Sequence, residues 1–257
     1  MARFVGIDIG SVTCKGVVVN DGEVETSLII ASGLNYREPV EKLSHWLETV
    51  LQPVDISKVA VTGYLQDRIF QGARQIADIR CCARGTNSLF PAVRTVIDVQ
   101  GQSTQVIRVG EYGSAVNFAV SEKCASGSGR FLEIIANVLQ IDLEELGPIS
   151  LNSSLPVAFS TGCAVFGESE AISRVAEGIP TEDIIAGVHK ALAEKIAALI
   201  KKVGLEEPCA FSGGGALNVG LIRSLEDKLG ISLLIPNQPQ TVNAIGAAII
   251  AERDTKS

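Results

Sequence analysis

A lone cysteine lies at the mouth of a glycine-rich turn in EKCASGSGRF, residues 122–131. Glycines in such a turn let backbone N–H groups converge on an anion, and a thiolate is both an anion and a metal ligand. Cys124 has no second cysteine nearby, and the chain contains no C-x-x-C motif. Cys163, in STGCAVFG, is also isolated. We predict helices from about Ser128 and about Val165, so that each cysteine precedes a helix N-terminus, which stabilises negative charge.

Two aspartates each close a hydrophobic strand pattern and lead into a turn of glycine and hydroxyl residues. They are Asp8 in GIDIGSVTCK and Asp98 in VIDVQGQSTQ. Such a turn can present backbone N–H groups to phosphate oxygens, while the carboxylate holds Mg²⁺ through water. In a third stretch, FSGGGALN at residues 211–218, a strand runs into three glycines, where close backbone approach suits a ribose or adenine. Each loop alone is typical of an ordinary turn, but the three together predict a nucleotide site.

Strands and helices must position these loops. Hydrophobic alternation predicts a three-stranded meander in the first thirty residues, then a helix around PVEKLSHWLETVL, a strand at KVAVTGY and helical segments through ADIRCCARGTNSL. Near residue 95 the meander begins again, and Asp98 follows Asp8 by 90 residues. A repeat this long predicts two related lobes facing one another. We assign residues 1–95, with a helix at 243–254 packing back, to the first lobe and residues 96–242 to the second.

The second half is predicted to add a strand at CAFSGGG, a helix at VGLIRSLEDKLG and a short strand at SLLIP. A long helix precedes them, with Thr181 as its cap and Gly204 after its last turn. The residues expected on its core face are Ile185, Val188, Leu192, Ile196 and Leu199.

Composition excludes several other classes of protein. The 257 residues are 46% hydrophobic with a net charge of −7 and no block of Lys and Arg, so neither nucleic acid nor an anionic membrane surface is an expected partner. The apolar runs are too short to span a membrane, and the N-terminus enters a strand pattern at once, so we predict a cytoplasmic protein. The chain has only two histidines, His45 and His189, and both are predicted at the surface. A His-rich zinc site or a Ser-His-Asp triad is therefore not expected. No P-loop motif occurs.

The three loops resemble those of the actin, Hsp70 and sugar kinase superfamily of ATPases, an α/β fold of two ribonuclease-H-like lobes around an ATP cleft. Three further stretches, EKCASGSGRFLEIIA, STGCAVFGESEAIS and NAIGAAIIAERD, resemble one branch of it. That branch comprises the ATP-dependent activators of 2-hydroxyacyl-CoA dehydratases, related to the ATP-binding subunits of benzoyl-CoA reductases. The similarity extends over nearly the whole chain, and the cysteine motifs are its most specific part.

The resemblance implies a homodimer in which Cys124 and Cys163 of each subunit bind one [4Fe-4S] cluster shared across the twofold axis. It implies an ATPase that accepts one electron from ferredoxin or flavodoxin and passes it to an iron–sulfur enzyme such as a dehydratase, a benzoyl-CoA reductase or a double-cubane cluster protein. ATP binding and hydrolysis would rotate the lobes and change the dimer face around the cluster. Of the other cysteines, we expect Cys14 and Cys209 to be buried small hydrophobes and Cys81 and Cys82 to pack within a helix.

The expected roles of the loop residues follow from the same match. Asp8 and Asp98 would organise Mg²⁺, and Gln102 would orient the attacking water. The expected ATP- and ADP-binding residues are Gly10, Ser11, Thr13 and Lys15 for the outer phosphates, Gly101, Gln102 and Ser103 for the rest of the phosphate grip, Gly213, Gly214 and Gly215 for the nucleoside, and in addition Asn218 and Gln240.

Two stretches depart from the family pattern. The second phosphate loop is DVQGQS, whereas similar family members read DIGGQD, so Gln100 replaces a glycine and Ser103 replaces a carboxylate. The usual CHARG appears here as CCARG. Asp98, Gly101 and Gln102 are kept, so metal and phosphate binding are still expected, and the differences are typical of a divergent subfamily with another electron acceptor.

Two other functions fit parts of the same pattern. A sugar or acyl kinase of this fold would use the same cleft with a hydroxyl substrate in place of water and would need no cluster. An actin-like assembly protein would polymerise with ATP, although a chain of 257 residues lacks the extra subdomains that filament-forming proteins usually carry.

Overall fold

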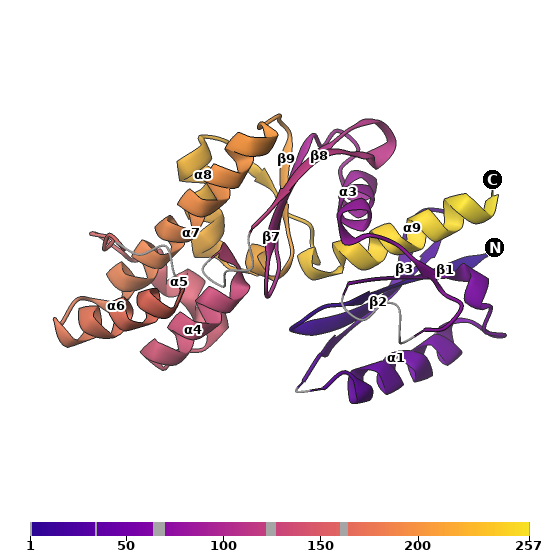
Figure 1. Ribbon diagram of the computed structural model, residues 1–257, viewed down its shortest axis with the longest axis horizontal. Helices are drawn as coiled ribbons and strands as arrows, with labels where there is room; N and C mark the ends of the chain where they lie inside the picture. Colours follow the sequence, from indigo (N-terminus) through magenta and orange to yellow (C-terminus); the bar gives the residue numbers. More distant parts are fainter. Residues whose placement is uncertain (1, 34, 64–69, 122–126, 160–163, 257) are drawn as a thin grey trace. The chain divides into compact units, whose positions relative to one another are not determined.

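The computed structural model describes residues 2–33, 35–63, 70–121, 127–159 and 164–256 (Figure 1). The chain forms two compact units. Unit 1 contains residues 1–96, 107–117 and 236–257, and unit 2 contains residues 97–106 and 118–235. The α/β fold class predicted from the sequence is confirmed. The division into lobes at residue 95 stays a prediction.

The sheet of unit 1 has five strands in the order β3-β2-β1-β4-β5. β1 runs antiparallel to β2 and parallel to β4, and β2 runs antiparallel to β3, as the predicted meander requires. Positive φ angles at Asp21 and Gly22 form the tight turn between β2 and β3. The strands are β1 (Arg3–Ile9), β2 (Thr13–Asn20), β3 (Glu23–Ala31), β4 (Val59–Gly63) and β5 (Arg74–Gln75).

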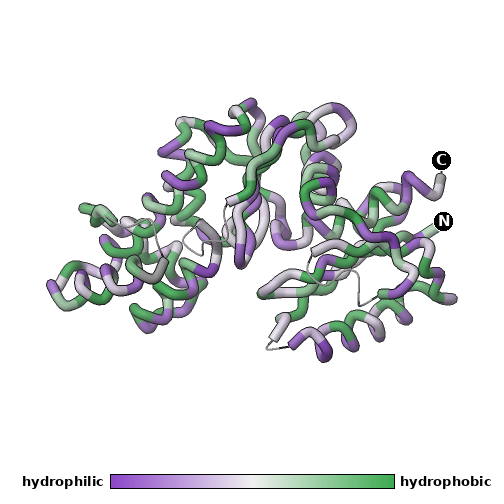
Figure 2. Tube along the Cα trace, viewed as in Figure 1, coloured by the Kyte–Doolittle hydropathy of each residue, from purple (hydrophilic) through white to green (hydrophobic). Residues whose placement is uncertain are grey.

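Helices cover both faces of this sheet (Figure 1). α1 (Arg37–Val50) alternates between hydrophilic and hydrophobic residues (Figure 2), and its buried Leu43 and Leu47 join the cluster formed by alternate residues of β1. α9 (Val242–Lys256) and α3 (Asp78–Leu89) pack on the other face. The approach of α9 to β1 is close, because a Cβ at Gly6 would overlap the carbonyl oxygen of Ala244. The Asp8 side chain belongs to this same face of β1, two residues after Gly6.

The second sheet repeats the order of the first. Its strands run β10-β9-β6-β7-β8, so β6 takes the place of β1 and β9 the place of β4. The predicted repeat of the meander is therefore seen in the strand order. The strands are β6 (Thr95–Val99), β7 (Thr104–Val109), β8 (Ala115–Val120), β9 (Cys209–Ser212) and β10 (Leu233–Leu234).

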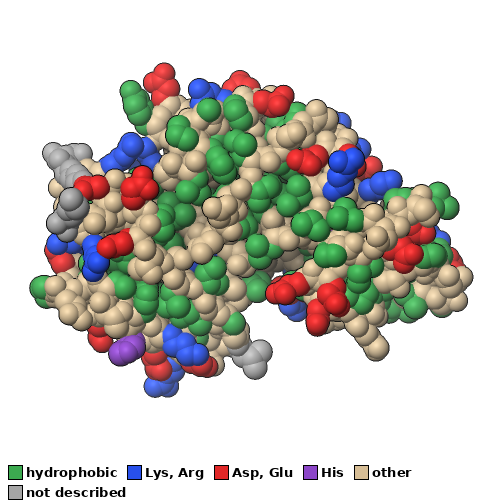
Figure 3. All heavy atoms as spheres, turned by 180° about the vertical axis from the view of Figure 1, so that it is seen from behind, with side chains coloured by type: hydrophobic (Ala, Val, Ile, Leu, Met, Phe, Trp, Pro, Cys, Tyr) green, Lys and Arg blue, Asp and Glu red, His purple; other side chains and the backbone are tan. Residues whose placement is uncertain are grey.

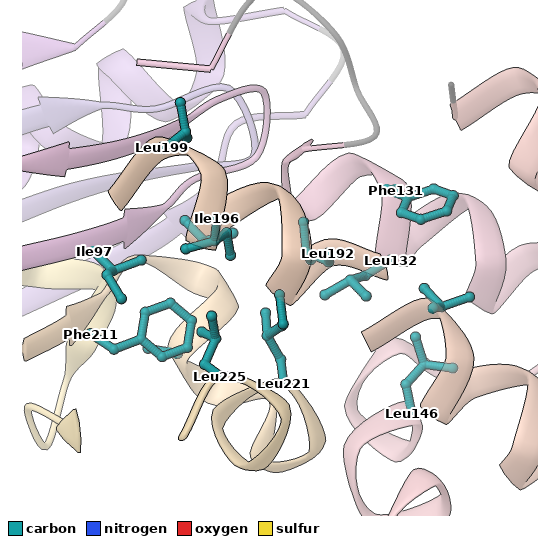
Figure 4. Packing of buried hydrophobic residues seen from close by; sticks show 14 of the residues in the cluster. Ile97, Phe131, Leu132, Leu146, Leu192, Ile196, Leu199, Phe211, Leu221 and Leu225 are labelled. Atoms are coloured by element: carbon teal, nitrogen blue, oxygen red, sulfur yellow. The ribbon is translucent and has the colours of Figure 1, made fainter. Parts of the chain in front are cut away.

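Unit 2 buries a large hydrophobic cluster between its strands and helices (Figure 4). Its helices are α4 (Gly129–Leu139), α5 (Leu146–Ser150), α6 (Ala164–Ala176), α7 (Thr181–Val203) and α8 (Val219–Leu229). Short 3-10 helices are η1 (Ile56–Lys58), η2 (Glu111–Gly113), η4 (Leu143–Glu145), η5 (Gly214–Leu217) and η6 (Pro239–Thr241). The predicted core face of α7 is buried and Gly204 ends the helix. Thr181, predicted as its cap, is instead the first helical residue and follows Pro180.

The prediction that both histidines lie at the surface is correct for one of them and wrong for the other. His45 is exposed on α1, but His189 is completely buried on α7. α5 and α8 cover that part of α7, and a Cβ at Gly220 would approach the His189 ring to 2.7 Å. Ser150 satisfies Nδ1 at 3.1 Å. Burial lowers the pKa of His189 to about 4, so the ring is neutral at physiological pH.

The four cysteines predicted to pack in the interior do so. The thiols of Cys14, Cys81, Cys82 and Cys209 are all buried and reduced. Burial raises the pKa of the Cys209 thiol to about 12, so it stays protonated and unreactive.

Charged side chains of both signs lie close together on the face drawn in Figure 3. Among the helices of the described ranges, we find no segment both long enough and apolar enough to cross a bilayer.

Candidate functional site

The first predicted phosphate loop is the turn between β1 and β2. Asp8 is 5% exposed and lies directly across the strand pair from Lys15. The Lys15 Nζ donates to Asp8 Oδ2 at 2.9 Å, so a cation and a carboxylate meet in a largely buried position. The Gly10 N–H donates to the Thr13 carbonyl at 3.1 Å and closes the turn, which leaves Ser11 at its tip. The loop therefore presents a lysine and a carboxylate that could bind phosphate and a metal ion.

The second loop repeats this geometry with a neutral donor. The Gln100 N–H donates to the Ser103 carbonyl at 2.8 Å, which is the turn of the first loop moved on by 90 residues. Gln105 lies 90 residues after Lys15, and its Nε2 donates to Asp98 Oδ2 at 2.9 Å. Gln105 was not among the predicted site residues, although the repeat offset of 90 residues locates it. The repeat therefore keeps a hydrogen-bond donor to each aspartate and changes its charge.

Gln100, which stands where similar family members have glycine, contacts the Asp98 carboxylate. Its Nε2 donates to Asp98 Oδ2 at 2.7 Å, beside the bond from Gln105. The Ser212 hydroxyl donates to Asp98 Oδ1 at 3.1 Å. Three side chains thus hold Asp98, which is 2% exposed. A metal ion in direct contact with this carboxylate would compete with those donors, which favours contact through a water molecule.

A glycine lies against each aspartate, at the end of the neighbouring strand. Gly63 ends β4 with φ +87°, and Gly213 follows β9 with φ +79°. A Cβ at Gly63 would lie 2.7 Å from Asp8 Oδ1, and one at Gly213 would lie 2.5 Å from Asp98 Oδ1. Gly213 was predicted to meet the nucleoside, whereas Gly63 was not among the predicted site residues. The shared signal was a hydroxyl residue followed by glycine at a strand end.

The remaining predicted nucleotide-binding residues lie in η5, at the start of α8, in η6 and in the turn of the second loop. Gly214 is exposed at the start of η5, whereas Gly215 is buried against Val99. The Asn218 side chain caps α8 by accepting from the Leu221 N–H at 2.9 Å. Gln240 is half-buried in η6 of unit 1. Gly101, Gln102 and Ser103 form the turn of the second loop, with Gln102 exposed. The roles of these residues in binding stay predictions.

Cys124 lies outside the described residues, but the chain on either side of it is fixed to the second loop. The Thr104 backbone exchanges hydrogen bonds with Ser121, through the Ser121 hydroxyl and the Ser121 N–H. The Thr104 hydroxyl also donates to the Gly127 carbonyl. One residue, next to the phosphate loop, therefore contacts both flanks of the cysteine segment.

The helix that follows this segment begins on the second loop, as predicted near Ser128. The Gly129 N–H donates to the Gln100 carbonyl at 2.8 Å, and the Arg130 N–H donates to the Gly101 carbonyl at 2.9 Å. Two of the unpaired N–H groups at the α4 N-terminus are thus satisfied by the phosphate loop itself. The turn of the second loop is therefore joined directly to the start of α4.

Cys163 also lies outside the described residues, immediately before α6. α6 packs on α4 at a close contact, because a Cβ at Gly167 would lie 2.8 Å from the Phe131 ring. The helices that follow the two cysteines are therefore in contact within one unit. Among the described residues, no group of three or more His, Cys, Asp or Glu side chains is placed to hold a metal ion.

The model of the BadF/BadG/BcrA/BcrD ATPase family matches residues 5–251. A 2-hydroxyisocaproyl-CoA dehydratase activator from Clostridioides difficile is 39% identical over 256 residues, which cover 98% of this chain and 96% of the relative.

Solved structures agree with this match. The structure of the 2-hydroxyisocaproyl-CoA dehydratase activator from Clostridium difficile with bound ADPNP has a TM-score of 0.90 at 37% identity, covering 99% of this chain and 96% of that one. Component A of the Acidaminococcus fermentans (R)-2-hydroxyglutaryl-CoA dehydratase has a TM-score of 0.93 at 34% identity and full coverage of both chains. A ROK family glucokinase from Streptomyces griseus, at 15% identity with a TM-score of 0.62 and coverage of 98% and 100%, shares the fold alone.

Proposed function

The chain belongs to the BadF/BadG/BcrA/BcrD ATPase family, and from this membership we propose that it is an ATP-dependent activator that donates single electrons to a partner iron–sulfur enzyme. The acceptor would be a 2-hydroxyacyl-CoA dehydratase, a benzoyl-CoA reductase or a double-cubane cluster protein, and the electron would come from ferredoxin or flavodoxin. The observation that carries the proposal is one set of hydrogen bonds: the second loop accepts from the start of α4, and Thr104, the residue after this loop, contacts Ser121 and Gly127 on the two sides of the segment that contains Cys124.

Nucleotide binding would use the paired aspartate loops. Lys15, held by Asp8, would contact a phosphate, while Asp8 and Asp98 would hold Mg²⁺ through water. Gln102, exposed at the turn of the second loop, would orient the attacking water. The bound ADPNP in the similar activator structure supports binding of an adenine nucleotide.

Cys124 and Cys163 would hold a [4Fe-4S] cluster. A [4Fe-4S] cluster takes four thiolate ligands, and these two cysteines would supply two of them. A twofold-related copy of the chain would supply the other two, so we propose a homodimer. When bound, the cluster would supply reversible one-electron transfer at low potential. The contact of α4 with α6 supports this donor set, because it joins the two helices that follow the cysteines.

The second loop would connect ATP hydrolysis with the cysteines. Loss of the γ-phosphate changes what the N–H groups of the Gln100–Ser103 turn bind. Because the Gln100 and Gly101 carbonyls accept from the α4 N-terminus, a shift of this turn moves α4 and the flanks of Cys124. A displacement at the nucleotide would in this way reach the dimer face around the cysteines.

The deciding measurement is iron and acid-labile sulfide content, with a visible spectrum, on anaerobically purified protein. We expect about four irons per dimer and a brown colour that bleaches in air. Cys124→Ser and Cys163→Ser should each lose the colour. Cys209→Ala, which removes a buried thiol of the unit 2 core, should keep it.

A colourless wild-type protein that still hydrolyses ATP would refute the electron-transfer proposal. If such a protein phosphorylated a sugar or an acyl substrate, the kinase alternative would replace it. Iron retained in full by Cys124→Ser would remove that cysteine from the ligand set.

A further inference from the structure

A basic pocket lies in unit 1, outside all three nucleotide loops. Arg80 and Arg84 are four residues apart on α3 and therefore share one helix face. Arg253 and Asp254 come from α9, and residues 113–115 complete the wall. The pocket encloses about 260 Å³, more than a bare ion fills. Three guanidinium groups thus line one pocket, and the function proposed above gives none of them a role.

Arg84 is the least satisfied of these groups. Its Nε and Nη1 are buried and make no hydrogen bond with any part of the chain that the structure describes. η2 covers the base of the side chain, since a Cβ at Gly113 would lie 3.2 Å from the Arg84 Cα. A buried donor of a charged group that lacks a partner costs free energy, and a guanidinium cannot escape this cost by losing its proton.

The surrounding charge makes the position of Arg84 less favourable still. Burial, followed by the positive charges of Arg253 and Arg80, lowers the pKa of Arg84 from its usual value. The one acidic residue of the pocket, Asp254, is engaged by Arg74 at 2.6 Å. The pocket therefore has a surplus of positive charge and of unused donors, and an anion would relieve both.

We propose that this pocket binds a phosphate-type oxyanion, with Arg84 as the principal donor. A tetrahedral oxyanion has enough acceptors for several guanidinium groups, each of which presents donors in a planar fork. A carboxylate offers only two oxygens, fewer acceptors than the guanidinium groups of Arg84 and Arg80 can donate to. The volume admits inorganic phosphate with water, or a phosphoryl group attached to a small metabolite.

The test separates this pocket from the nucleotide site. Wild-type protein saturated with Mg–ADP is titrated with inorganic phosphate by calorimetry, and with chloride at equal ionic strength as control. We expect saturable phosphate binding that weakens at least about tenfold in Arg84→Gln and in Arg80→Gln. Arg223→Gln, which removes an exposed arginine paired with Asp227 on α8 of unit 2, should bind phosphate as the wild type does. ATPase activity should be the same in all three variants.

Two further measurements complete the design. Crystals soaked in tungstate should place the ion within hydrogen-bond distance of the Arg84 guanidinium. Glycerol phosphate tests for an attached group: tighter binding than inorganic phosphate would identify a phosphorylated metabolite, and weaker binding would identify the free ion. Equal phosphate affinity in Arg84→Gln and wild type, or tungstate found only at other positions, would overturn the proposal. If Arg84→Gln does not fold, Arg80→Gln and the tungstate position decide it alone.

Discussion

Replacing Gly213 by Ala would test whether the glycine at the end of β9 fixes the Asp98 carboxylate. Gly213 has φ +79° and ψ −178°, a backbone conformation that is essentially restricted to glycine. A Cβ at this position would overlap the carbonyl oxygen of Val99 and lie 2.5 Å from Asp98 Oδ1. Both neighbours are part of a buried strand end and have little room to move.

The expected loss of stability in Gly213→Ala follows from these two effects. The backbone conformation costs an alanine about 1–3 kcal/mol. Forcing a methyl group into a packed site costs about 1–3 kcal/mol more. We therefore expect the free energy of unfolding to fall by about 2–6 kcal/mol. Since relief of the overlap must displace Asp98, kcat for ATP hydrolysis should fall at least about tenfold, which corresponds to about 1.4 kcal/mol.

Gly230→Ala provides a matched control. Gly230 also has a positive φ, +69°, but its ψ of 27° is the ordinary left-handed conformation, and apart from its own chain neighbours no atom of the described residues lies within 4 Å of a Cβ built there. This variant should lose only about 1–2 kcal/mol and keep wild-type ATPase activity. Urea denaturation followed by circular dichroism, together with steady-state ATPase assays, measures both quantities. Equal stability and equal kcat in the two variants would refute the role assigned to Gly213.

Three other substitutions have definite expected outcomes. Lys15→Gln gives the first loop the neutral donor that Gln105 supplies in the second, so KM for ATP should rise about tenfold through loss of a charged contact worth about 1.5 kcal/mol; an unchanged KM would remove Lys15 from phosphate binding. Gln100→Gly removes one donor to Asp98, so less Mg²⁺ should be needed for half-maximal ATPase activity, and a greater requirement would contradict the competition inferred here. His189 has a pKa near 4 when folded and about 6.5 when unfolded, so the folded state binds fewer protons and stability should fall between pH 6.5 and 4 by about 3 kcal/mol. Replacing His189 by Gln should flatten that part of the curve of unfolding free energy against pH, and an unchanged curve would show that burial does not hold the ring neutral.

Much of the fold could be predicted because its signals are local. Alternating hydrophobic residues and turn residues mark both meanders, and the offset of 90 residues between Asp8 and Asp98 predicts that the second sheet repeats the first. The cysteine motifs and the C-terminal stretch are continuous in sequence, so the family resemblance could be stated from them, and the comparisons confirm it. The roles of Cys124 and Cys163 stay predictions.

Properties that depend on neighbours from distant parts of the chain could not be predicted in this way. The surface position expected for His189 is wrong because α5 and α8 cover it, and no pattern within α7 reveals that cover. The side chain of Gln100 could not be foreseen to turn back onto Asp98, because a departure from a motif specifies a residue type and not its rotamer.

The amino-acid sequence by itself determined the repeated strand–turn units, the aspartates that end their first strands and the order of the elements, because backbone periodicity and turn chemistry act over a few residues. Only the tertiary structure decided which side chains meet. Gly63 lies against Asp8, Gln105 takes the place of Lys15, and arginines of α3 and α9 share a pocket although some 170 residues separate them. These contacts arise when strands pair and helices pack, since the neighbours of a buried side chain are set by the whole fold.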